Sequence, residues 1–324
     1  MRVLFTSLAS VGHTYPLIPL AIAARDAGHE VHFAVGDAVH APLTANGLRP
    51  FRPADSFYEI YAEDLEPELA RLEPDLVVHE WGLPAGAVAA RRAGIPGIWH
   101  GFGRMFPEGI GLDVPPSGAP HVDICPPSLQ DKDFLATADR IALRPVPYST
   151  PSGWAVPSTS RPLVYLTLGT AFGTAELLTT AIRGLTTLGA RVVVATGRVP
   201  VKELGDLPDG VTAEAWVPQA DLLPHVTLVV HHGGSGTTLG ALAAGVPQLL
   251  LPQGADQFAN ADAVTAAGAG LSLGPAEVSA DAVADQVLSL LGRAGHREAS
   301  RAIAEEIALM PSPAEVAHHL PDHV

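Results

Sequence analysis

Residues 231–238, HHGGSGTT, place two histidines, three glycines and small hydroxyl side chains directly after an apolar run. That run, VTLVV at 226–230, is rich in β-branched residues and predicts a strand buried on both faces. The segment that follows, TLGALAAG, has helical composition and ends in Gly245, where a left-handed cap belongs. The stretch therefore predicts a strand, a glycine turn and a helix in succession.

A turn of this kind can bind a phosphate. Free N–H groups at a helix start converge on one spot, and the helix dipole adds partial positive charge there, so no lysine is needed. The residues placed to offer these donors are Gly236, Thr237 and Thr238, with His232 just before them. A glycine turn that serves only packing has the same pattern, so the neighbouring segments must decide between the two interpretations.

Two flanking segments favour a nucleotide-sugar as the ligand. Asp256 and Gln257 follow the next predicted strand, and ligands of parallel sheets bind at the carboxyl ends of strands. An acid and an amide at that place can hold sugar hydroxyls. Upstream, Trp216 and Gln219 offer a flat apolar surface and a hydrogen-bonding amide, which suit a base.

The segments WVPQ, HHGGSGTT and DQFANA together resemble the donor-binding signature of glycosyltransferase family 1. The resemblance is strongest to the bacterial natural-product branch of macrolide type, and its motifs span roughly the last half of the chain. It implies an α/β structure of the GT-B type, with two Rossmann-like parallel-sheet domains facing a central cleft. The first domain is then expected to bind the acceptor and the second the nucleotide-sugar donor.

Length and patterning also indicate two domains. A chain of 324 residues is long for one domain, and strands alternate with helices along it. Residues 149–161 have the composition of a linker. We therefore expect a compact acceptor-binding domain over 1–148 and a donor-binding domain over 162–324 that includes the C-terminal helix. Relatives usually have a longer first domain, which puts the acceptor pocket in doubt.

Three parts of the chain are predicted in less detail. Residues 55–74 form an acidic helical stretch, and residues 107–127 lack periodicity and indicate a loop at the cleft. The histidines near the C-terminus indicate a frayed tail; these are His318, His319 and His323.

Catalysis requires a base, because a hydroxyl is a poor nucleophile until its proton is removed. His13 lies at a predicted strand-to-helix turn and matches the catalytic histidine of the family in its Gly-His-x-x-Pro pattern. Relatives orient this histidine with an Asp after a later strand. Here DLVVHEW offers Glu80, with Asp75 as the less favoured alternative, and an ordinary strand-end carboxylate is an equally good interpretation of Glu80. Thr170 ends another strand and is expected to face the phosphates, although a threonine there also suits a helix cap.

Composition excludes several classes of function. The net charge of −15 argues against a nucleic-acid surface, and the single cysteine, Cys125, excludes an internal disulfide and a cysteine-based zinc site. Asp131 and Asp133 spell D-x-D, but acids early in a predicted helix suit its dipole, so we expect no metal. No run approaches the length of a membrane span, and the N-terminus is interpreted as a strand rather than a signal peptide. These features predict a cytoplasmic protein.

The sequence thus predicts an inverting glycosyltransferase that moves a sugar from UDP or dTDP to a hydroxyl of a small natural product, such as a polyketide, macrolide or aromatic aglycone. The expected partners are the donor and the acceptor, with no cofactor and no nucleic acid, and a homodimer is compatible with the sequence. Three alternatives stay open. They are a nucleotide-sugar 2-epimerase, a peptidoglycan N-acetylglucosaminyl transferase, and a non-catalytic nucleotide-sugar-binding partner of another transferase.

Overall fold

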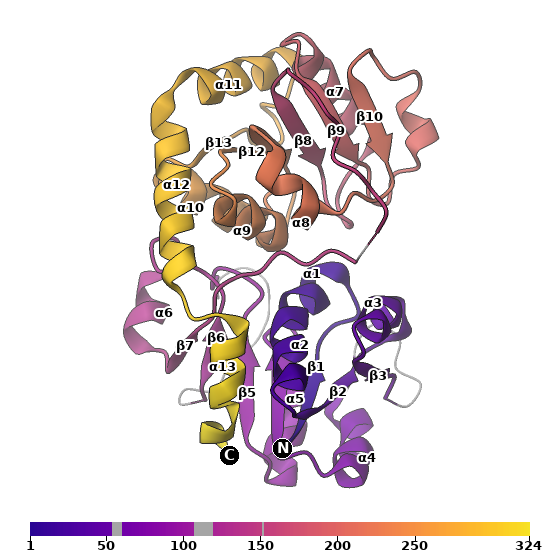
Figure 1. Ribbon diagram of the computed structural model, residues 1–324, viewed down its shortest axis with the longest axis vertical. Coiled ribbons are helices and arrows are strands. Elements are labelled where there is room, and N and C mark those ends of the chain that lie inside the picture. The colour runs from indigo at the N-terminus through magenta and orange to yellow at the C-terminus, as the bar shows by residue number, and fades with distance from the viewer. Residues whose placement is uncertain (54–59, 107–118, 151) are drawn as a thin grey trace. The chain divides into compact units, whose positions relative to one another are not determined.

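The computed structural model describes residues 1–53, 60–106, 119–150 and 152–324. The chain divides into two compact units, each of which is described by itself (Figure 1). Unit 1 comprises Met1–Thr150 and Leu309–Val324, and unit 2 comprises Pro151–Ala308.

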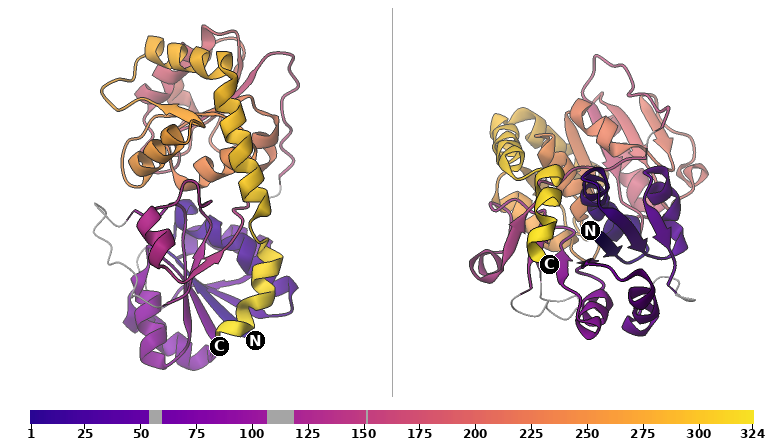
Figure 2. Two further views of the ribbon diagram at one scale, coloured as in Figure 1. Left: turned by 90° about the vertical axis from the view of Figure 1, so that its left-hand side faces the viewer. Right: turned by 60° about the horizontal axis from the view of Figure 1, so that its bottom comes forward.

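Unit 1 is built on a seven-stranded sheet in the order β3-β2-β1-β4-β5-β6-β7, with every pair parallel. Parallel strands need crossover connections, and the helices between them lie on both faces of the sheet (Figure 2). The strands are β1 (Arg2–Thr6), β2 (Glu30–Ala34), β3 (Arg49–Phe51), β4 (Leu76–Glu80), β5 (Gly97–His100), β6 (His121–Asp123) and β7 (Arg140–Ala142). The helices are α1 (Val11–Thr14), α2 (Ile18–Asp26), α3 (His40–Ala45), α4 (Ala62–Leu72), α5 (Pro84–Ala93), α6 (Lys132–Thr137) and α13 (Pro313–His319).

Unit 2 has a six-stranded parallel sheet in the order β10-β9-β8-β11-β12-β13. The order reverses between β8 and β11, and this is the kind of switch point at which α/β sheets bind ligands. The strands are β8 (Leu163–Thr167), β9 (Arg191–Ala195), β10 (Val211–Glu214), β11 (Leu228–His231), β12 (Gln248–Leu250) and β13 (Gly270–Ser272). The helices are α7 (Ala175–Thr186), α8 (Gln219–Leu222), α9 (Ser235–Ala243), α10 (Gln257–Ala266), α11 (Ala280–Gly292) and α12 (Ala294–Leu309).

The central strands are apolar because both of their faces are covered. All five residues of β8 and all four of β11 are buried, as the β-branched runs predict. One core of unit 2 joins these strands to α7 and α11, and a second lies on the other side around Leu222 and Val229. The linker residue Trp154 packs against this second core, and its indole Nε1 donates to Glu214 Oε1 at 2.8 Å. The linker is thus held on unit 2.

The C-terminal segment differs from its predicted placement in the second domain. Residues 309–324 belong to unit 1, where α13 packs against α2. Nor is this segment a frayed tail, since Val316, Ala317 and Leu320 are buried. The helix begins with a capping box in which Ser312 Oγ accepts from Glu315 N at 3.3 Å and Glu315 Oε2 accepts from Ser312 N at 2.7 Å. That S-x-x-E pattern, with Pro313 at the first helical position, is the sequence feature that indicates a helix here.

The predicted loop at 107–127 also differs in part. Residues 107–118 lie outside the described residues, but 121–123 form strand β6, all three residues of which are buried. Its sequence, HVD, is too short and too polar to show strand periodicity, and its pairing with β5 and β7 supplies the order. Of the predicted helix at 55–74, residues 62–72 form α4, and residues 54–59 lie outside the described part of the chain.

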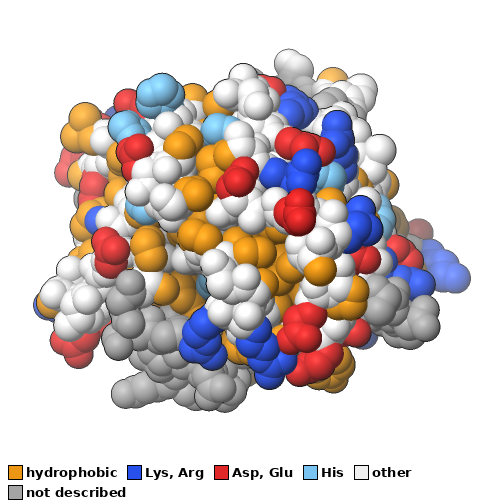
Figure 3. Space-filling view, turned by 90° about the horizontal axis from the view of Figure 1, so that it is seen from below, with side chains coloured by type: hydrophobic (Ala, Val, Ile, Leu, Met, Phe, Trp, Pro, Cys, Tyr) orange, Lys and Arg blue, Asp and Glu red, His pale blue; other side chains and the backbone are white. Residues whose placement is uncertain are grey.

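Charged side chains are interspersed on the face of the molecule in Figure 3, where basic and acidic groups lie close to one another. In unit 1, the Arg92 guanidinium lies 2.9 Å from Glu63 Oε1 and 2.8 Å from Glu66 Oε1. Such exposed pairs contribute little to stability.

Candidate active site and donor site

In unit 1 the structure brings His13 and Glu80 together. His13 lies in α1, the short helix after β1, and its Nδ1 is 3.1 Å from Glu80 Oε1. The Glu80 carboxylate is fully buried, whereas the His13 side chain is 26% exposed. Nδ1 is within ion-pair distance of this carboxylate, although the pair does not have hydrogen-bond geometry. With the carboxylate on the Nδ1 side of the ring, Nε2 is the nitrogen that can accept a proton.

The position of Glu80 follows from its place at the end of β4. Its Oε1 accepts a hydrogen bond of 2.5 Å from the backbone N–H of Gly82, just beyond the strand. Asp75, the alternative partner predicted from sequence, precedes the same strand at its amino end and accepts from Arg2 N at 2.6 Å. Asp75 is therefore engaged elsewhere, and Glu80 is the carboxylate that meets His13.

Aromatic rings surround the histidine. The centroid of the Phe102 ring is 4.8 Å from that of His13, at an interplanar angle of 63°. Trp81 stacks on Phe102 at 5.4 Å, and Phe106 meets Trp81 edge-on at 5.2 Å. All three aromatic residues are buried. They pack around the imidazole. The sequence did not indicate this contact because Phe102 and Phe106 follow β5, far along the chain from His13.

In unit 2 the two adjacent histidines have different roles. The side chain of His231 is buried, with Nε2 2.7 Å from Gln248 Oε1 and Nδ1 accepting from Gly233 N at 3.1 Å. These partners fix the Nε2–H tautomer, and burial lowers the pKa of His231 to about 3. Gln248 in turn donates to the carbonyl of Thr238 at 3.3 Å. His231 is therefore a structural tie between β11, β12 and α9.

His232 lies in a gap made by two glycines. A Cβ built on Gly169 would lie 2.4 Å from His232 Nε2, and one built on Gly234 would lie at the same distance. The imidazole thus fills the space between the loop after β8 and the start of α9. Burial lowers the pKa of His232 to about 4, although Asp256 and the Thr167 backbone favour the charged form. At neutral pH the ring is neutral and can offer a phosphate a hydrogen bond rather than a charge.

The start of α9 supplies fewer free donors than predicted. The helix begins at Ser235, before the three residues predicted to offer free N–H groups, so Thr238 N already donates to Gly234 O at 3.0 Å. The Thr238 hydroxyl binds the same carbonyl at 3.0 Å, so Thr238 is occupied and the prediction that its N–H serves a ligand is wrong. Gly236 and Thr237 occupy the second and third helical positions, whose N–H groups have no intrahelical acceptor. Gly236 is exposed, with open space where a side chain would lie.

Asp256 is tied to this helix start. Its Oδ2 accepts from Ser235 N at 3.1 Å, from Ser235 Oγ at 2.7 Å and from Asn260 Nδ2 at 2.9 Å. Ser235 and Asn260 were not predicted as site residues. The spacing of Asp256 and Asn260, four apart at the start of α10, was the available signal.

The neighbouring Gln257 is buried and held by its own loop. Its Oε1 accepts from the backbone of Gln253 at 2.8 Å and of Gly254 at 3.2 Å. Because two N–H groups identify the oxygen end of the amide, the other end of Gln257 is a donor. Asp256 Oδ1 and Gln257 Nε2 are thus an acceptor and a donor on adjacent residues, a pairing that suits hydroxyl groups.

Two residues of unit 2 are predicted to bind the base. Trp216 is 42% exposed, and Gln219 begins α8 three residues later. The Thr237 hydroxyl donates to Gln219 Oε1 at 3.2 Å, so the base segment and the phosphate segment share a hydrogen bond. Thr170 is exposed in the turn after β8, next to Gly169. The neighbouring Ala171 carbonyl accepts from the Arg198 guanidinium at 2.7 Å.

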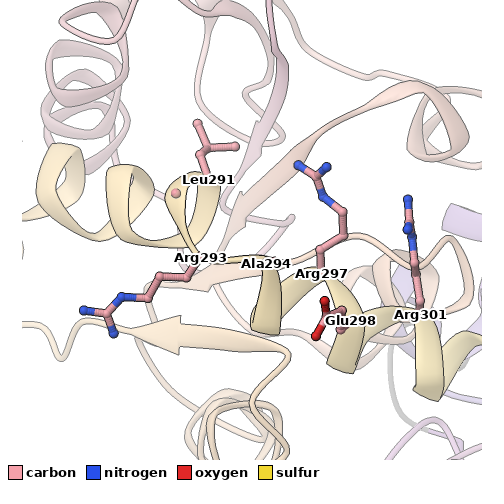
Figure 4. A pocket seen from close by; sticks show the side chains of 7 residues that line it. Leu291, Arg293, Ala294, Arg297, Glu298 and Arg301 are labelled. Carbon is pink, nitrogen blue, oxygen red and sulfur yellow. The ribbon is translucent and has the colours of Figure 1, made fainter.

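Two further features lie apart from these residues. Asp131 is the N-cap of α6, where its Oδ1 accepts from Phe134 N at 2.9 Å, as the helical interpretation of the D-x-D pattern predicts. A hollow of about 310 Å³ lies where α11 meets α12, and Arg297 and Arg301 project to the same side of α12 there (Figure 4). None of the predicted site residues lines it.

Comparisons with known proteins agree with this geometry. A family model described as the C-terminal domain of erythromycin biosynthesis protein CIII-like proteins matches residues 179–322. The L-demethylnoviosyl transferase of Streptomyces niveus is 36% identical in an alignment that covers 99% of this chain and 97% of the relative. The chain belongs to the glycosyltransferases of antibiotic and natural-product pathways.

Other relatives of the transferase extend the match. The elloramycin glycosyltransferase ElmGT of Streptomyces olivaceus is 33% identical, covering 99% of this chain and 97% of the relative. Among solved structures, glycosyltransferase VinC in complex with dTDP has a TM-score of 0.84 at 25% identity and covers 99% of both chains. Spinosyn rhamnosyltransferase SpnG has a TM-score of 0.85 at 27% identity, covering 99% of this chain and 100% of the other. The fold of the transferase is therefore GT-B.

These relatives bear on two of the alternatives left open by the sequence. The S. niveus and S. olivaceus relatives are both named as transferases, which supports a glycosyltransferase over a 2-epimerase or a non-catalytic partner. The alignment with the S. niveus protein extends over 375 positions, whereas this chain has 324 residues, so the relative has segments without a counterpart here. Among the residues that the structure describes, no helix is both long and apolar enough to cross a membrane.

Proposed function

We propose that the transferase moves a sugar from dTDP, or from UDP, to a hydroxyl of a small natural product, with inversion at the anomeric carbon. The observation that carries the proposal is the His13–Glu80 pair, an imidazole with one nitrogen 3.1 Å from a buried carboxylate. The structures of VinC with dTDP and of SpnG with thymidine diphosphate favour dTDP over UDP. A complex of SpnG with spinosyn aglycone supports a natural-product acceptor.

The reaction would be one direct displacement. His13 Nε2 takes the proton of the acceptor hydroxyl while its oxygen bonds to the anomeric carbon, and the bond from that carbon to the diphosphate oxygen breaks. Glu80 stabilises the imidazolium that forms, because its Oε1 lies 3.1 Å from Nδ1 and the carboxylate carries the opposite charge. One displacement with no covalent intermediate inverts the configuration.

The leaving diphosphate would be held in unit 2. The N–H groups of Gly236 and Thr237 and the dipole of the nine-residue helix α9 favour its negative charge. His232 adds a neutral hydrogen-bonding group beside them. Asp256 and Gln257 bind the sugar hydroxyls, and Trp216 with Gln219 binds the base. Thr170 contacts the phosphates from the loop after β8.

The test is a product assay with dTDP- and UDP-sugars and a panel of hydroxyl acceptors. We expect nucleoside diphosphate release only when an acceptor is present, and a product whose anomeric configuration, measured by NMR coupling constants, is opposite to that of the donor. Retention of configuration would contradict the single displacement. Release of the nucleotide at the same rate without acceptor would indicate hydrolysis or elimination instead.

A further inference from the structure

The turn between β4 and α5 carries a glycine that touches both members of the proposed dyad. A Cβ built on Gly82 would lie 2.9 Å from Glu80 Oε1, 3.0 Å from Glu80 Oε2 and 3.0 Å from His13 Cε1. The first distance is one that real Cβ atoms essentially never show and the other two are unusually tight, so a side chain at 82 must shift the carboxylate and press on the imidazole. Gly82 is buried, and its N–H is the 2.5 Å donor to Glu80 Oε1.

The neighbours of the dyad leave it little freedom to move aside. Glu80 is the last residue of β4 and pairs in register with His100 of β5, so its backbone is fixed by the sheet. The imidazole of His13 has the Phe102 ring at 4.8 Å. Trp81, between Glu80 and Gly82, is buried against Phe102 and Phe106. A Cβ at position 82 would therefore push on groups that are packed on their other sides.

We infer that Gly82 is a positioning residue of the transferase, which sets the His13–Glu80 distance through its N–H and through the absence of a side chain. This inference rests on the proposed role of His13 as the base. Hydrogen bonding to Gly82 N–H holds the carboxylate at one oxygen, and the missing Cβ leaves room for the imidazole beside it. A glycine is required here for space, since its backbone conformation is one that other residues also adopt.

The first experiment compares turnover in Gly82→Ala, His13→Ala and the double variant. We expect Gly82→Ala to lower kcat by on the order of 10- to 100-fold, because a displaced base loses its reacting geometry, while donor Kd stays unchanged. In the His13→Ala background the same substitution should cost nothing further in kcat, because there is no base left to misplace. An equal loss in both backgrounds would show a general structural effect and overturn the inference.

A matched control is Gly86→Ala in α5. A Cβ there would lie 2.7 Å from His79 Cβ and 2.7 Å from Thr6 Cγ2, so it crowds unit 1 as strongly without touching the dyad. We expect this variant to lower the melting temperature and to leave the acceptor dependence of kcat as in the parent. If Gly86→Ala and Gly82→Ala lose kcat alike, positioning by Gly82 is contradicted.

A second measurement does not depend on activity or on the folding of Gly82→Ala. The added methyl meets the Glu80 carboxylate first, so Glu80→Ala should make room for it. Adding Gly82→Ala should therefore lower the melting temperature less in the Glu80→Ala background than in the parent protein. Failure of the single variant Gly82→Ala to fold would agree with this expectation. Equal falls, or a double variant that does not fold although Glu80→Ala does, would contradict the packing argument.

The ¹⁵N NMR signals of the His13 imidazole distinguish the role of Gly82 as a positioning residue from the role of His13 as the base. If they report an Nδ1 contact with the Glu80 carboxylate that Gly82→Ala removes, while His13→Ala keeps full activity, then Gly82 positions the pair but the proposed base is wrong. If Gly82→Ala leaves these signals and kcat unchanged, the inference about Gly82 fails whatever the role of His13.

Discussion

The imidazole Nδ1 of His13 and the carboxylate Oε1 of Glu80 lie 3.1 Å apart, although the two residues come from different crossovers of the unit 1 sheet. Strand β4 pairs directly with β1, and both residues lie at the carboxyl ends of these strands. The pairing of neighbouring strands thus brings the two side chains to one edge of the sheet. In such a sheet this edge is where ligands bind.

Loss of the base should affect chemistry and spare donor binding. We expect His13→Ala to lower turnover by about 10²- to 10⁴-fold and to leave dTDP affinity unchanged, because the donor residues lie in the other unit. The loss should be smaller with a nitrophenol acceptor, whose proton is already acidic. Steady-state kinetics and calorimetry measure the two effects. Full activity of the variant on an aliphatic alcohol would place the base elsewhere.

Substitution of Glu80 should lower turnover, and substitution of Asp75 should not. Glu80→Gln keeps the shape of the side chain but removes the charge that stabilises an imidazolium, so we expect a drop in kcat smaller than that of His13→Ala. Asp75→Asn is the matched control, since Asp75 lies at the other end of β4 and binds the Arg2 backbone. Comparable drops in the two variants would argue against a specific role for Glu80.

Substitution of Gln257, but not of Asp256, should affect binding of the sugar without affecting binding of the nucleotide. Gln257→Ala is expected to weaken the complete donor and to leave free dTDP binding as it is. Asp256→Ala should weaken both ligands, because Asp256 Oδ2 also holds Ser235 at the start of the phosphate-binding helix. Calorimetric titration of each variant with dTDP and with a dTDP-sugar distinguishes them. Loss of free dTDP binding in Gln257→Ala would refute the separation.

Stability should fall in mild acid because neutral histidines are buried. Burial lowers the pKa of His79 to about 3, with a smaller contribution from His121, and it lowers the pKa of His121 to about 3 as well. Between pH 6.5 and about 3 the unfolded chain binds protons that the folded chain does not, so the free energy of unfolding decreases as pH falls. Each such histidine adds a slope of up to about 1.4 kcal/mol per pH unit.

Melting temperatures measured from pH 7.5 to 5 test this. His79→Gln should reduce the slope of stability against pH. His319→Gln serves as the surface control, because the His319 side chain is 68% exposed. A His79 variant with the parental slope would contradict the assignment.

The sequence predicted where most of the proposed donor-binding residues lie relative to the strands, because these residues are local. Trp216, His232 and Asp256 each follow or precede a strand whose apolar pattern is strong, so their positions at strand ends could be predicted. The occupation of Thr238 could not, because it depends on whether α9 begins at residue 235 or 236, and helix boundaries are not fixed by composition. Contacts between distant segments, such as Phe102 on His13, leave no periodic signal.

The return of residues 309–324 to unit 1 makes unit 2 an insertion within unit 1 rather than a second half of the chain. An exchange of sugar specificity between relatives therefore needs two junctions, one near Thr150 and one near Ala308. A chimera joined only at the linker would carry a foreign α13 against the resident α2, whose interface includes the buried Val316 and Ala317. Grafting unit 2 as a cassette with both ends matched would leave that helix pair native.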